Sequence, residues 1–249
     1  MKKDQQLRAF EQYVSAYDAN DPKIRLKIEH SFRVADLSEG IAETVDGADR
    51  EFAWTIGLLH DIGRFEQVRR YHTFVDADSV DHAQLGADLL FQEGLISEFT
   101  GNSLDMERQR LMETAIRGHN AYRLPEGLTE EERCFCDILR DADKIDIFRV
   151  MCETSLEKIF DAETEELRAS GVSDGVKECF LGRRAVPREV RKTLADKTVS
   201  HLCLVFELVY PVSRKIAKEQ GYVDRLLEFP SDNGDTRAWF AYMREHIWT

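Results

Sequence analysis

The chain has 249 residues, 43% of them hydrophobic and 33% charged, which suits a globular protein with one buried core. Its net charge of −13 argues against long nucleic acid as a partner. A small anionic or phosphorylated substrate stays open, because a bound metal reverses the local field. No apolar run approaches the roughly 20 residues that span a bilayer, and the charged start has no apolar signal segment. We therefore expect a cytoplasmic protein without a membrane partner; its oligomeric state is left open.

Helical periods run through the chain without strand alternation, which predicts an all-α fold. In the first half, helices are expected over residues 3–18, 22–44, 49–62, 80–92 and 107–119. Gly63 is expected to end the third of these helices as a C-cap. Residues 64–78 have no clean period and predict a loop over a site, in which Tyr71, His72 and Phe74 could close over a substrate.

The second half of the chain continues the helical pattern. A capping-box sequence opens a helix at residue 129, and its expected buried face carries Phe135, Ile138, Leu139, Ala142 and Ile145. Further helices are expected over 153–168 and 176–181, then from Pro187 into a long helix kinked at Pro211, and in a last amphipathic segment. Five scattered cysteines indicate reduced thiols rather than disulfides. With no repeat and no change of composition, the chain predicts one all-α domain over residues 1–249.

Six imidazole and carboxylate side chains fall on the expected inner faces of these helices. His60 and Asp61 end an apolar run, and His30 shares a stripe with Val34 and Leu37. A buried carboxylate beside a buried imidazole is costly unless hydrogen bonds or a cation compensate it. The set consists of His30, His60, Asp61, His82, His119 and Asp143.

Each of these residues also has a simpler explanation. A single histidine on an apolar face is more often a hydrogen-bonded core residue than a ligand, and an aspartate such as Asp143 beside Lys144 is commonly one half of an ion pair. Six unrelated polar burials in one core explain the pattern less well than one metal site does. Histidine nitrogen and carboxylate oxygen suit divalent Mn, Fe, Co, Ni or Zn, and the carboxylates also suit Mg.

The order His30, then His60-Asp61, then Asp143 resembles the HD-domain superfamily of metal-dependent phosphohydrolases. The resemblance covers about residues 24–150 and implies a compact multi-helix bundle with a metal-binding core, followed by a C-terminal helical extension over 151–249. It also implies that these four residues hold a first divalent metal ion.

His82 and His119 are similar to the histidine pair that holds a second metal in some members of the superfamily. The resemblance thus implies one or two divalent ions per chain, with Asp61 able to bridge them. Asn120 stands where cyclic-dinucleotide phosphodiesterases of the superfamily have an adjacent histidine, and their Gly-Tyr-Pro signature is absent, so that substrate is not carried over.

The implied reaction is hydrolysis of a phosphate ester by a metal-activated water. The sequence shows neither a nucleophile elbow nor a glycine-rich phosphate loop. We expect Asp61, Arg64 and Lys144 to be catalytic, and Arg64, Arg117, Arg123 and Lys144 to bind the anionic substrate. The simpler explanation of the four basic residues is a set of surface salt bridges with the abundant acids.

Two other functions remain open. The six-ligand order also resembles the mixed-valent di-iron oxygenases of the superfamily, which cleave C–C or C–P bonds with dioxygen. The site could instead belong to a non-catalytic module that senses a metal or a nucleotide.

Overall fold

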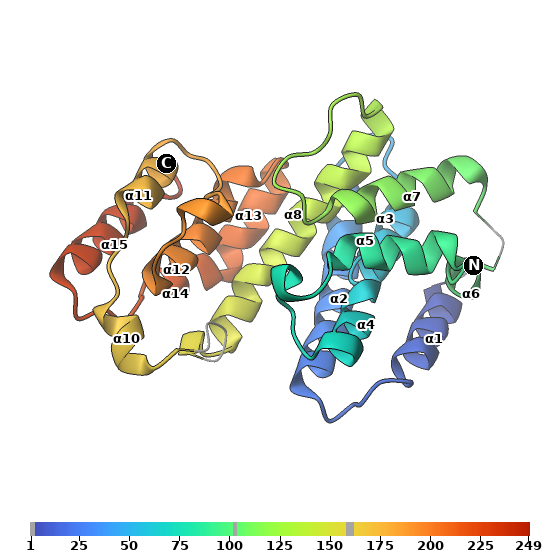
Figure 1. The fold of residues 1–249 in the computed structure, drawn as a ribbon. Helices are drawn as coiled ribbons and strands as arrows, with labels where there is room; N and C mark the ends of the chain where they lie inside the picture. The colour runs from blue at the N-terminus through green and yellow to red at the C-terminus, as the bar shows by residue number, and fades with distance from the viewer. Residues whose placement is uncertain (1–2, 102–103, 158–161) are drawn as a thin grey trace. The chain divides into compact units, whose positions relative to one another are not determined.

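The fold is that of a computed structural model, which describes residues 3–101, 104–157 and 162–249 (Figure 1). The described residues form helices and turns and contain no strand, so the predicted all-α class is confirmed. The chain divides into two compact units, an N-terminal unit of residues 1–143 and a C-terminal unit of residues 144–249. Within the described residues, no helix is both long and apolar enough to cross a membrane, and the five cysteines are free.

The N-terminal unit contains the helices that carry the predicted ligands. Its elements are α1 (Lys3–Val14), α2 (Pro22–Ala42), α3 (Arg50–Leu59), α4 (Ile62–Tyr71), the 3₁₀ turn η1 (Asp76–Asp78), α5 (His82–Ala87), the π-helical turn η2 (Asp88–Gln92), α6 (Ile96–Thr100), α7 (Met106–Gly118) and the first part of α8 (Glu130–Glu153). The predicted buried face of α8 is confirmed, since its five apolar residues are at most 3% exposed.

Helices α2 and α3 pack closely because Gly57 has no side chain. A Cβ atom at Gly57 would lie 2.8 Å from Ala35 Cα and from Val34 O. This approach brings the buried faces of the two helices together (Figure 1). It places His30 of α2 beside His60, which follows the last residue of α3; their ring centroids are 5.2 Å apart.

The predicted loop over residues 64–78 is wrong in its first half, because α4 covers Ile62–Tyr71. The buried face of α4 includes Glu66 and Gln67, which are 5% and 0% exposed. These polar residues interrupt the apolar period from which a helix is predicted. The polypeptide turns only at His72, whose φ of 56° ends the helix in the left-handed region.

The prediction that Gly63 ends a helix is wrong, because Gly63 lies in the first turn of α4. Its role is close packing, because a Cβ atom there would come within 2.6 Å of Gly86 N and closer still to the carbonyl oxygen of His82. Glycine thus lets α5 lie against α4. The contact brings His82 at the start of α5 next to Asp61 at the start of α4.

The C-terminal unit is built from shorter helices. They are α10 (Thr164–Ala169), α11 (Asp174–Leu181), η3 (Arg188–Val190), α12 (Leu194–Leu202), η4 (Cys203–Glu207), α13 (Pro211–Gln220), α14 (Tyr222–Leu226) and α15 (Gly234–His246). The predicted helix over 153–168 is confirmed only in parts. Thr154 and Ser155 interrupt it, and α10 (Thr164–Ala169) covers its last part; residues 158–161 lie outside the described residues.

The predicted long helix from Pro187 is also wrong. Leu208 is extended, with ψ of 120°, and Pro211 begins a new helix instead of kinking an old one. Proline has no N–H to donate, so it is well placed at the first position of a helix.

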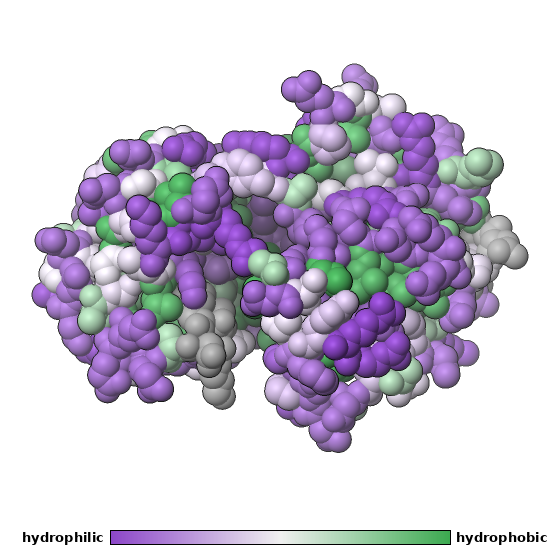
Figure 2. Space-filling view, viewed as in Figure 1, coloured by the Kyte–Doolittle hydropathy of each residue, from purple (hydrophilic) through white to green (hydrophobic). Residues whose placement is uncertain are grey.

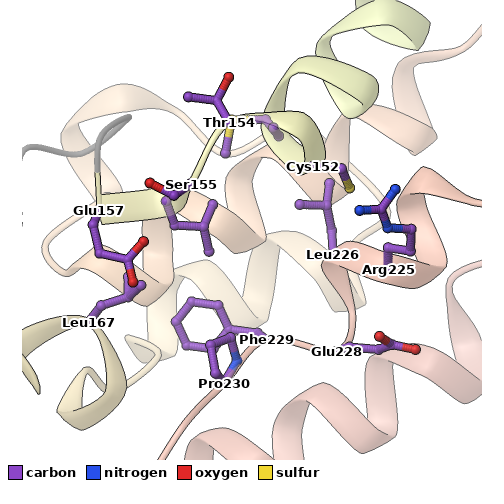
Figure 3. A pocket seen from close by; sticks show the side chains of 12 residues that line it. Cys152, Thr154, Ser155, Glu157, Leu167, Arg225, Leu226, Glu228, Phe229 and Pro230 are labelled. Carbon is purple, nitrogen blue, oxygen red and sulfur yellow. The ribbon is translucent and has the colours of Figure 1, made fainter. Parts of the chain in front are cut away.

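The surfaces of both units are predominantly hydrophilic on the face that Figure 2 shows. The C-terminal unit contains a pocket of about 230 Å³ between the end of α8 and the segment after α14. Phe229, Leu226 and Leu167 form its apolar wall, and Arg225 and Glu228 lie at its edge (Figure 3). None of the predicted site residues lines this pocket.

Candidate metal centre

The six predicted ligands meet inside the N-terminal unit. His30 comes from α2, His60 and His119 are the C-cap residues of α3 and α7, Asp61 is the N-cap residue of α4, His82 is the first residue of α5, and Asp143 lies on α8. The four histidines and Asp61 are at most 6% exposed, and the Asp143 side chain is 15% exposed. The Asp61 side chain makes no capping hydrogen bond to α4, so its carboxylate is turned to the histidines.

One group of donors forms around one oxygen of Asp61. His30 Nε2 and His60 Nε2 both lie 3.6 Å from Asp61 Oδ2. The same two nitrogens lie 3.1 and 3.8 Å from Asp143 Oδ1. We call these four residues the first pocket; ligand atoms of His30, His60 and Asp143 are close enough together to hold one ion.

The other oxygen of Asp61 faces a second group. Asp61 Oδ1 lies 3.4 Å from His82 Nε2 and 3.7 Å from His119 Nε2. The two histidine nitrogens are 3.0 Å apart. We call Asp61, His82 and His119 the second pocket. The carboxylate of Asp61 therefore presents one oxygen to each pocket, which is the arrangement a bridging ligand needs.

Hydrogen bonds fix the orientation of three of the rings. His60 Nδ1 and His119 Nδ1 each lie 2.7 Å from a backbone carbonyl, of Gly57 and Ile116. His82 Nδ1 lies 2.7 Å from Asp76 Oδ2. Because these partners only accept hydrogen bonds, each Nδ1 carries the proton and each Nε2 presents a lone pair to the pockets.

This donor set fits a divalent metal ion. His60 Nε2 and Asp61 Oδ1 are buried and have no hydrogen-bond partner among the described residues. The Nε2 lone pairs of His82 and His119 face each other at 3.0 Å, which is unfavourable unless a cation lies between them. Imidazole nitrogen and carboxylate oxygen together are ligands of intermediate divalent metals.

The protonation states also suit metal binding. Burial lowers the pKa of His60 to about 3, and burial lowers the pKa of His82 although Asp76 opposes the shift. Burial alone would raise the pKa of Asp61, but the Lys27 ammonium and the neighbouring histidines hold it well below its usual range. Neutral imidazole and ionised carboxylate are the forms that ligate metals.

Lys27 and Asp76 belong to the site but were not predicted from the sequence. Lys27 Nζ donates to Asp61 Oδ2 at 2.6 Å. Its position three residues before His30 could have placed it on the same helical face. Asp76, which orients His82, gives no such signal because it lies outside any long helix.

Arg64 is a predicted basic residue that lies beside a predicted ligand. Its Nε lies 3.7 Å from Asp61 Oδ1. Its Nη1 donates to Asp76 Oδ1 at 3.0 Å and to the Phe74 carbonyl at 2.7 Å. Of the expected closing residues, Phe74 is half-buried beside Arg64, whereas Tyr71 and His72 are exposed.

The other basic residues are placed differently. Arg117 is engaged by Asp88 at 2.7 Å and by Glu113 at 2.8 Å. Arg123 is exposed beside the Tyr122 ring. Lys144 follows Asp143 on α8 and is 7% exposed. For these residues the expected contact with substrate stays a prediction.

Arg140, one turn before Asp143 on α8, supports the end of α7. Its Nη1 donates to the carbonyl oxygens of Gly118, His119 and Ala121 at 2.6 to 3.2 Å. These bonds satisfy carbonyls that the helix end leaves open, and they fix the backbone that carries His119.

A comparison with known families finds a match for one part of the chain. Residues 28–148 match the family model of the HD domain. The match includes the six predicted ligands and ends within α8. No curated protein and no solved structure matches the chain. Residues 28–148 of this chain are therefore a domain of the HD family.

Proposed function

We propose that the protein is a metal-dependent phosphohydrolase that cleaves a small phosphorylated metabolite or nucleotide. The observation that carries the proposal is the convergence of four buried imidazoles on the two oxygens of Asp61, with three of the rings anchored through Nδ1. His30, His60, Asp61 and Asp143 would hold one divalent ion, and Asp61, His82 and His119 a second.

The residues of the chain have separate tasks in such a reaction. Divalent ions in a site of this kind lower the pKa of water to make a nucleophile and neutralise charge on the phosphoryl group. Asp61 connects the two pockets, because one of its oxygens faces each of them. Arg64 lies beside Asp61 with a cationic head that can bind a phosphoryl oxygen. Lys144, next to Asp143, is the second basic residue proposed to contact substrate.

The first test is metal content together with ester hydrolysis. Protein purified without added metal or chelator is analysed for metal per chain and assayed against a panel of phosphate esters. His60→Ala and Asp61→Ala should lose metal and hydrolysis, because each removes a ligand that no neighbour can replace. His246→Ala, at a half-buried histidine of α15 in the C-terminal unit, is the matched control. Full hydrolysis in either ligand variant would refute the site.

The second pocket also fits the di-iron oxygenases of the superfamily, which use a similar six-ligand set. About two iron ions per chain with dioxygen uptake, and no ester hydrolysis, would favour that reaction. Metal binding without either activity would leave a metal- or nucleotide-sensing module.

A further inference from the structure

Two cationic side chains, of Lys27 and Arg64, lie at the partly open side of the metal centre. Each is 15% exposed, whereas the four histidines are at most 6% exposed. Building on the proposed function, we propose that Lys27 and Arg64 bind the phosphoryl oxygens of the substrate and that the substrate is a phosphate monoester.

Arg64 has a hydrogen-bond donor to offer. Its Nη1 is held by Gln67, the Phe74 carbonyl and Asp76 at 2.7 to 3.0 Å. Its Nε is buried, has no hydrogen bond among the described residues and faces Asp61 Oδ1 at 3.7 Å. A buried donor without an acceptor is unfavourable. An anionic oxygen placed beside Asp61 and the metal ions would satisfy it.

Lys27 has a charge to offer once the metal centre is filled. Its ammonium group lies 2.6 Å from Asp61 Oδ2, the same oxygen that faces His30 and His60. Asp61 would contribute this oxygen to an ion held by the first pocket, and Lys27 would then no longer be its only counter-charge. The ammonium group would then be close to the ions and available to an anion.

The ring of Phe74 keeps both cations at this side of the site. Lys27 Nζ lies 5.6 Å and Arg64 Cζ 5.5 Å from the ring centroid, distances at which a cation is attracted to an aromatic ring. The Phe74 carbonyl also accepts from Arg64. The segment after α4 thus positions two positive charges around one ligand site.

Two cations in addition to metal ions favour a monoester. A terminal phosphate group carries two negative charges near neutral pH and three oxygens, whereas a diester carries one charge. Asp61 and Asp143 already place two carboxylates in the site. A second positive side chain therefore helps to compensate the two negative charges of a monoester. The single charge of a diester does not need it.

The test is calorimetric titration of the metal-loaded protein with inorganic phosphate and, separately, with dimethyl phosphate. We expect wild type to bind inorganic phosphate more tightly than dimethyl phosphate. Lys27→Met should weaken phosphate binding about 10- to 100-fold, the range of one charge-assisted hydrogen bond, without changing the metal content. Lys27→Arg should restore part of the affinity. The matched control is Lys23→Met, one turn earlier on α2, where the exposed ammonium group donates to the His72 carbonyl.

If wild type holds metal and hydrolyses an ester, three outcomes would overturn this inference and leave the proposed function intact. The first is equal phosphate affinity in Lys27→Met and wild type. The second is a loss of metal in Lys27→Met, which would make Lys27 only a support of Asp61. The third is equal affinity of wild type for dimethyl phosphate and inorganic phosphate, which would contradict the proposal that the substrate is a monoester. A wild type without metal would overturn the proposed function and this inference together.

Discussion

Asp76 offers the sharpest test of how the second pocket is held. It accepts the Nδ1 hydrogen of His82 at 2.7 Å, and so keeps His82 Nε2 directed at Asp61 and His119. Asp76→Ala removes this acceptor and leaves the imidazole free to rotate or to change tautomer. Outer hydrogen bonds of this kind are typically worth about 10- to 100-fold in metal affinity, or about 1.4 to 2.7 kcal/mol.

The structure also predicts a graded effect. Asp76→Asn keeps a neutral acceptor, and charge-assisted hydrogen bonds are roughly twice as strong as neutral ones. The asparagine variant should therefore lose about half as much, roughly 0.7 to 1.4 kcal/mol. The first pocket should keep its affinity in both variants, because the His60 ring is held by the Gly57 carbonyl and not by Asp76.

The assay is competition for metal between the protein and a chelator, with metal per chain measured at each chelator concentration. Asp78→Ala is the matched control, since Asp78 lies on the same 3₁₀ turn with an exposed side chain. Asp76 also accepts from Arg64 and Gln67, so chemical unfolding must show that the variants remain folded. Equal loss of both metals, or less than a twofold change in Asp76→Ala, would refute the reasoning.

Three further predictions concern packing, metal removal and pH. Gly63→Ala should destabilise the fold by about 1–3 kcal/mol through overpacking against α5. Gly40→Ala, with no atom within 4 Å of the new Cβ, should be neutral or stabilising. Guanidinium unfolding checks both variants, and equal shifts would contradict the packing argument. Chelation should lower the thermal midpoint and metal should restore it, because metal binds only the folded site; an unchanged midpoint in a calorimeter would contradict this. Burial lowers the pKa of His201 to about 4. Between pH 6.5 and about 4 the unfolded state therefore binds more protons than the folded state. The free energy of unfolding should fall as pH is lowered through this range, by at most about 1.4 kcal/mol per pH unit. His201→Gln should flatten this dependence in unfolding curves, and an unchanged slope would remove His201 as its source.

That the predicted ligands lie together could be expected from the sequence because helical periodicity is local. A residue such as His30 shares its face with Val34 and Leu37 whatever the rest of the chain does. Asp61 needed only its position after an apolar helix. The fold class followed from the same periods, and the buried face of α8 was confirmed residue by residue.

The features that the sequence did not predict depend on contacts between residues that lie apart in the chain. Glu66 and Gln67 are polar yet buried, so α4 was predicted as a loop. Gln67 is satisfied by Asp76, Ser79 and the Val80 carbonyl, partners that no periodicity identifies. The role of Asp76 in turn depends on its contact with His82, the first residue of α5.

The anchoring of the histidine rings has a consequence for how the site can change over generations. His60 and His119 are oriented by main-chain carbonyls, which every amino acid supplies, so no codon change at Gly57 or Ile116 deletes those acceptors. The acceptor for the third ring, His82, is the side chain of Asp76. One substitution at Asp76 would therefore remove the acceptor of His82 in the second pocket, while the His60 ring of the first pocket would keep its own acceptor.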